Sequence, residues 1–166
     1  MTSILSNEDI ERLALGLIDR SLLKSEWTHA AHFAAALWLL RRRGLAAFAE
    51  MPALIRAYNE ATGTVNSDTS GYHETITLAS LRAAAAWLAQ RPADPLSTLF
   101  NELMASAFAR SDWLLKYWSK ELLFSTTARK KWVEPDLQAL PFEVGVLADL
   151  KPGMQDDCKE ILPPSK

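Results

Sequence analysis

The sequence predicts an all-α protein, a single-domain bundle of five or six helices. Apolar residues recur at the spacing of one helix face, beginning with Ile10, Leu13 and Leu17. Capping residues, prolines and glycines mark the ends of these segments, and the connections between them are short. Short connections favour antiparallel packing of neighbouring helices. No stretch alternates long enough to predict a strand, apart from a short piece at residues 142–146.

Local signals justify the individual helices. Ser6 is a good N-cap with Asp9 three residues later, Gly44 stops the second helix, and Pro52 suits the first turn of the third. The fifth helix is expected to begin at the cap-like pair Asp94-Pro95. The expected helices span 7–18, 27–43, 52–61, 72–90 and 95–109, with shorter ones at 111–118 and 125–132.

Two of these helices are expected to form the central pair of the bundle. Helix 27–43 is rich in alanine, and so is the stretch 83–86 of helix 72–90. Because alanine side chains are small, the two backbones can approach closely. From Phe33 to Leu40 there is no polar side chain, which predicts burial on every side. All three histidines of the chain lie on this central pair.

Length and composition limit the class of protein. The 166 residues fit one domain, expected over residues 1–150, followed by a flexible tail at 151–166. A net charge of −2 lacks the excess of Lys and Arg that phosphate binding requires, so no nucleic-acid partner is expected. No secretory signal and no apolar run of roughly 20 residues stands out, so we expect no membrane partner and a cytoplasmic, bacterial-type location. The protein is expected to be a monomer or a homodimer.

The histidines suggest a site with three possible interpretations. At 100° per residue, Glu26, His29 and His32 cover adjoining patches of one helix, and His73 starts the neighbouring one. In the first interpretation, His29, His32 and His73 bind one divalent Zn, Ni or Fe ion. In the second, one histidine acts as a general base without metal. In the third, they are buried histidines satisfied by hydrogen bonds.

A polar stripe near His73 predicts a pocket between the two central helices. Imidazole, hydroxyl, hydroxyl and methyl follow one face at His73, Thr77, Ser80 and Ala84. As an enzyme, the protein would use His29 and His73 on a small molecule, with Glu26 orienting His29. The residues expected to bind the substrate are Tyr58, Asn66, Tyr72, Thr77 and Ser80.

The same residues also permit other functions. The pocket could hold a small ligand without turnover, or the polar residues could form a satisfied core in an interaction protein. The polar loop at residues 62–71 leads directly into His73, and we expect it to lie over the mouth of the pocket.

Several phrases resemble a family of small bacterial proteins that carry a domain of unknown function. They are Trp27-Thr28-His29-Ala30-Ala31-His32, Tyr58-Asn59-Glu60, Gly71-Tyr72-His73-Glu74-Thr75-Ile76-Thr77 and Trp132-Val133-Glu134-Pro135-Asp136-Leu137. The resemblance covers roughly residues 26–142 and implies that these segments meet in one fold. A more distant resemblance is to DinB-type helical metalloproteins, which place three histidines on one divalent ion. There the paired histidines are usually four residues apart, whereas His29 and His32 are three apart.

Overall fold

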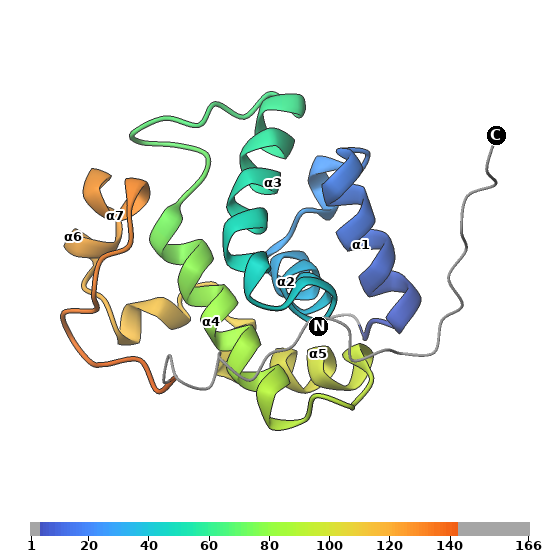
Figure 1. Ribbon diagram of the computed structural model, residues 1–166. Coiled ribbons are helices and arrows are strands. Elements are labelled where there is room, and N and C mark those ends of the chain that lie inside the picture. Colours follow the sequence, from blue (N-terminus) through green and yellow to red (C-terminus); the bar gives the residue numbers. More distant parts are fainter. Residues whose placement is uncertain (1–3, 143–166) are drawn as a thin grey trace.

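The computed structural model describes residues 4–142, and these residues contain helices and turns but no strand. The all-α prediction is therefore confirmed (Figure 1). The expected tail at 151–166 and most of the strand-like piece lie outside the described residues. The helices are α1 (Asn7–Asp19), α2 (His29–Arg43), α3 (Ala47–Ala61), α4 (Glu74–Gln90), α5 (Leu96–Met104), α6 (Lys120–Leu123) and α7 (Thr126–Lys130). Short 3-10 turns occur at η1 (Lys24–Glu26), η2 (Gly44–Ala46), η3 (Ala107–Ala109) and η4 (Trp113–Lys116).

Hydroxyl side chains fix where several helices begin. The Ser6 hydroxyl accepts from the Asp9 amide at 3.1 Å, and the Asp9 carboxylate accepts from the Ser6 amide at 3.0 Å, which completes the predicted capping box. Thr28 caps α2 by accepting from the Ala31 amide at 3.2 Å. Ser125 caps α7 in the same way, at the start of the short helix expected at 125–132.

Some predicted helix boundaries were wrong. Because Thr28 is the N-cap, α2 begins at His29 and not at Trp27. The turn η2 leads directly into α3, which leaves Pro52 inside that helix. Pro52 has no amide to donate one turn back, and the helix continues without that bond. The expected helix at 111–118 is only the 3-10 turn η4.

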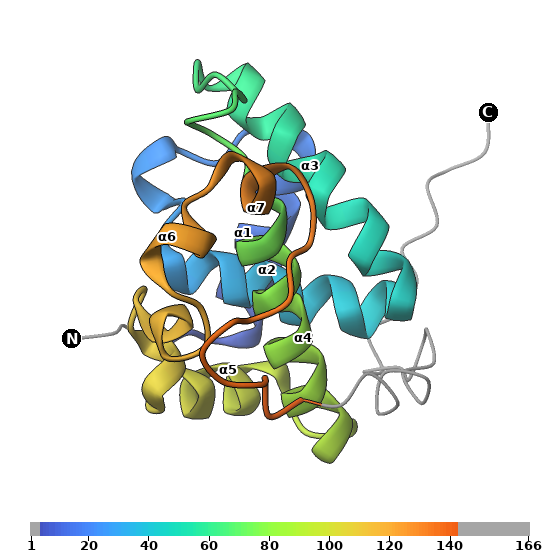
Figure 2. The same ribbon diagram turned by 90° about the vertical axis from the view of Figure 1, so that its left-hand side faces the viewer.

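The apolar core is built around α2. Every residue from Phe33 to Leu40 is buried, as predicted. The helix packs most extensively against α1 and α4, and Ala83, Ala84 and Ala85 are fully buried on the α4 side. Figure 2 shows α4 crossing in front of α2, with α7 and the loop before α4 near the upper end of α4.

None of the helices between residues 4 and 142 is long and apolar enough to cross a membrane.

Candidate functional site

A cleft of about 690 Å³ lies beside the N-terminal parts of α2 and α4. It is bordered by α3, by the loop before α4 and by the chain between α5 and α7. All three histidines line it. Much of the wall is apolar and comes from Ala36, Met51, Ile55, Ile76, Leu81 and Leu114.

Two histidines border the cleft on the first turn of α2. His29 is the first residue of the helix, and its Nε2 lies 2.7 Å from the carbonyl oxygen of Phe108. The Nδ1 of His32 lies 2.7 Å from the carbonyl oxygen of Thr28. The His32 ring also stacks on Trp27, with ring centroids 3.8 Å apart. Both imidazoles are therefore held in fixed orientations.

These hydrogen bonds also decide which ring nitrogen is protonated. A carbonyl oxygen can only accept, so the nitrogen beside it must donate. Neutral His29 therefore carries its proton on Nε2, and neutral His32 carries its proton on Nδ1. The other nitrogen of each ring, Nδ1 of His29 and Nε2 of His32, makes no hydrogen bond to residues 4–142. Each ring thus keeps one lone pair for a donor on a ligand.

His32 is neutral at physiological pH. Burial lowers its pKa from 6.5 to about 4, with the neighbouring His29 acting in the same direction. The hydrogen bond to the Thr28 carbonyl opposes this change but does not outweigh it. Near neutral pH the Nε2 of His32 is therefore unprotonated and can accept a hydrogen bond, but it is a weak base.

His73 has a structural role. It is the N-cap of α4: its Nδ1 accepts from the Ile76 amide at 3.2 Å. Its Nε2 lies 2.8 Å from the carbonyl oxygen of Leu123, to which it donates. Burial lowers the pKa of His73, and the positive charge of Arg129 lowers it further against the Leu123 hydrogen bond. Both nitrogens are occupied by the backbone, so the predicted catalytic role of His73 does not fit the geometry.

The three histidines do not form a shared metal site. Across residues 4–142, no three His, Cys, Asp or Glu side chains are grouped so that they could hold a metal ion. The interpretation of His29, His32 and His73 as one ligand set for Zn, Ni or Fe is therefore wrong. The physical reason is that His73 has no free nitrogen, because its Nδ1 accepts from the Ile76 amide and its Nε2 donates to the Leu123 carbonyl. His29 and His32 keep one free nitrogen each, so at most two of the three imidazoles could act as ligands.

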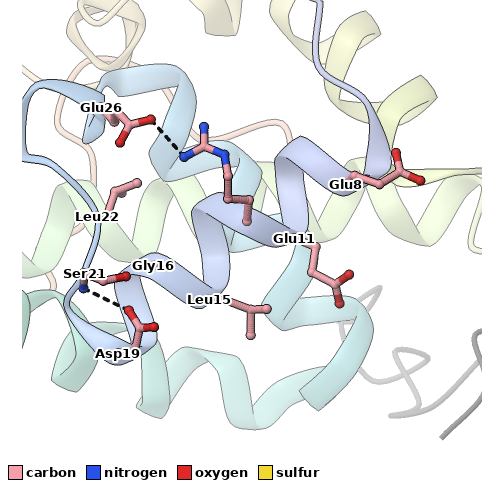
Figure 3. Close-up of a pocket in the computed structure, with 9 residues that line it drawn as sticks. Glu8, Glu11, Leu15, Gly16, Asp19, Ser21, Leu22 and Glu26 are labelled. Carbon is pink, nitrogen blue, oxygen red and sulfur yellow. Dashed lines mark hydrogen bonds and ion pairs between the residues drawn. The ribbon is translucent and has the colours of Figure 1, made fainter. Parts of the chain in front are cut away.

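Glu26 does not orient His29, so that prediction is also wrong. The Glu26 carboxylate lies 2.9 Å from Arg12 in an exposed ion pair. Both residues line a separate groove of about 550 Å³ along α1. Figure 3 shows Glu26 with other residues of this groove. The helix starts only after Thr28, so the rotation of 100° per residue does not extend back to Glu26.

Two of the predicted substrate-binding residues hold the fold and do not line the cleft. The buried Tyr58 hydroxyl donates to the Leu22 carbonyl at 3.0 Å. The Asn66 side chain fastens the loop before α4: its Oδ1 accepts from Asn59 at 2.9 Å and from the Tyr72 amide at 3.0 Å. Tyr58 and Asn66 are therefore structural residues.

The other three predicted substrate-binding residues do line the cleft: Tyr72, Thr77 and Ser80. The Tyr72 hydroxyl donates to the Glu74 carboxylate at 2.7 Å. Burial raises the pKa of Tyr72, and the Glu74 carboxylate raises it further. The phenol therefore stays protonated and directed at Glu74. Ser80 makes no side-chain hydrogen bond to the described residues, so its hydroxyl is free for a ligand.

The loop at residues 62–71 depends on Gly71. Its φ is +77°, and a Cβ there would lie 2.5 Å from the Val65 carbonyl oxygen. Gly63 has a similar φ of +81°, but a Cβ there would meet open space. We expect Gly71→Ala to cost at least about 2 kcal/mol of unfolding free energy and Gly63→Ala about 1 kcal/mol. Urea unfolding of both variants checks this; equal losses would contradict it.

Sequence reasoning gave no site role to Arg129, which lines the cleft. Its Nη1 donates to the carbonyl oxygens of Gly71 and Tyr72 at 3.0 and 3.3 Å. Arg129 belongs to the short basic run at residues 129–131, which in the sequence is indistinguishable from ordinary helix-end charge. Its contacts join residues 57 and 58 positions apart, which no local pattern reveals.

The sequence matches no protein-family model, and comparisons with curated proteins and with solved structures gave no match. The two resemblances noted from the sequence stay predictions.

Proposed function

We propose that the cleft binds a small, largely apolar molecule that donates a hydrogen bond to His32. The observation that carries the proposal is a cleft of about 690 Å³, largely apolar in its lining, that contains a neutral imidazole with one free lone pair. This volume falls within the range of roughly 300–1,000 Å³ typical of small-molecule sites. Apolar walls supply affinity, and a few fixed polar groups supply orientation.

The chemistry of His32 favours binding over general-base catalysis. A general base works best when its pKa lies near the operating pH. The pKa of His32 is about 4, so the imidazole removes protons weakly but accepts hydrogen bonds at all physiological pH values.

The net charge of −2 further supports a protein without nucleic-acid partners, and we expect a cytoplasmic location.

Filling the cleft tests the proposal. Ser80 lines the cleft from α4 and is only partly exposed, so Ser80→Trp should occupy part of the volume. With 4-ethylphenol as the probe, ligand-observed NMR should detect binding to the wild type and little or none to Ser80→Trp. Thr98→Trp is the matched control, because Thr98 is exposed on α5 and does not line the cleft. Equal binding by Ser80→Trp and the wild type would contradict the proposal.

A second probe tests the role of His32. Replacing 4-ethylphenol by 4-ethylanisole removes the hydroxyl donor and keeps the apolar body. A neutral hydrogen bond contributes about 0.5–1.5 kcal/mol, so the anisole should bind roughly 2- to 10-fold more weakly. His32→Phe should abolish the difference between the two probes. A difference that persists in His32→Phe would show that the hydroxyl binds elsewhere.

A further inference from the structure

Within residues 4–142, Arg129 differs from most other arginines in having no carboxylate partner. Six arginines form ion pairs with carboxylates: Arg12, Arg42, Arg43, Arg56, Arg91 and Arg110. In contrast, no carboxylate within residues 4–142 pairs with Arg129. Its side chain is partly buried and lines the cleft.

Two acidic residues of the cleft and of the loop before α4 pair with other basic residues. Asp112 is the only carboxylate among the described residues that line the cleft, and Arg110 holds it through two hydrogen bonds of 2.9 and 2.8 Å. Asp68, on the loop before α4, pairs with Lys130 at 2.7 Å. The positive charge of Arg129 is therefore uncompensated on the cleft side.

The backbone also holds the Arg129 guanidinium in a fixed position. Its Nη1 donates to the carbonyls of Gly71 and Tyr72. Its Nε and Nη2 make no hydrogen bond within residues 4–142, and neither is enclosed. The Nε–Nη2 edge of a guanidinium can bind both oxygens of a carboxylate at once.

We propose that the ligand of this cleft is a small anion, a carboxylate attached to an apolar body, and that Arg129 binds the carboxylate. This rests on the proposed function and adds the chemical class of the ligand. The apolar body would lie along the walls given by α2 and α4, and a donor on it would reach His32.

Three probes of one shape test the charge preference: 3-phenylpropanoate, 3-phenylpropanamide and 3-phenylpropylamine. In the wild type, affinity should follow the order acid, amide, amine. A hydrogen-bonded charge pair makes a tenfold or larger difference, so Arg129→Gln should weaken the acid about tenfold or more and leave the amide within about twofold. Arg129→Lys keeps the positive charge but not the Nε–Nη2 edge. Its loss of affinity for the acid should therefore lie between those of the wild type and Arg129→Gln.

A control variant removes one positive charge, as Arg129→Gln does, but at the C-terminal end of α2, away from the cleft. Arg43→Gln removes an exposed arginine that does not line the cleft, so acid binding should stay unchanged. The inference fails if the amide binds the wild type as tightly as the acid, or if Arg129→Gln weakens both equally. In those cases 4-ethylphenol binding would still support the proposed function. If neither 4-ethylphenol nor any of the three probes binds, both proposals fail.

Discussion

Replacing His73 with alanine is expected to lower the free energy of unfolding by about 2–4 kcal/mol. The variant loses the cap on the Ile76 amide, which is worth about 1 kcal/mol. It also leaves the Leu123 carbonyl without its buried donor, which costs about 1–3 kcal/mol. Urea unfolding followed by circular dichroism measures the change, provided that the slope with denaturant stays constant.

A second variant separates the two contributions. His73→Asn keeps a good N-cap acceptor, but its shorter side chain does not reproduce the bond to Leu123. It should therefore recover about 1 kcal/mol relative to His73→Ala. A loss of less than about 1 kcal/mol for His73→Ala would contradict the structural role of this histidine.

The stability of the protein should fall as the pH decreases from about 6.5 to 4, in part because of His32. Burial lowers the pKa of His32 from 6.5 to about 4 in the folded protein. In that interval the unfolded chain takes up a proton at His32 that the folded protein does not. Protonation therefore stabilises the unfolded state relative to the folded state. At about 1.36 kcal/mol per pKa unit the full change corresponds to about 3–4 kcal/mol. Because His32 is partly exposed to solvent, we expect about 2–3 kcal/mol of it, lost progressively toward pH 4.

The comparison of wild type with His32→Asn isolates this effect. Asparagine keeps an N–H donor for the Thr28 carbonyl but has no titrating ring. Carboxylates and His73, whose pKa is also lowered, contribute equally to both proteins and cancel in the difference. The stability difference between the two should therefore shrink as the pH falls from 7 to 4. A difference that is independent of pH would contradict the burial of a neutral His32.

Local sequence signals predicted the helices well where the cap is a side chain close in sequence. Ser6, Asp9 and Ser125 act within three residues of the amides they satisfy, so the pattern is complete in the sequence. The alanines of α2 and α4 likewise predicted the central pair, because small side chains decide how closely two helices pack. The predicted start of α2 at Trp27 was two residues too early, because Thr28 is the N-cap, and Glu26 therefore lies outside the helix.

The individual site roles depended on contacts that the sequence does not show. His73 has the residue type and spacing of a ligand or a base, but its partner is the carbonyl of Leu123, 50 residues away. Backbone carbonyls carry no sequence signature, so neither this bond nor those of His29 and Arg129 could be predicted from residue types. These tertiary contacts distinguish a histidine with both nitrogens bound to the backbone from one that keeps a free nitrogen in the cleft.

Long-range ¹H–¹⁵N NMR of the imidazoles, recorded on the full chain at pH 7 with and without 4-ethylphenol, tests the central claim most directly. We predict that His32 is neutral with its proton on Nδ1, and that the resonance of its Nε2 shifts when the phenol binds. The resonances of His73 should stay nearly unchanged, because both of its nitrogens are bound to the backbone. A proton on Nε2 of His32, or a ligand-induced shift that affects His73 and not His32, would contradict the account.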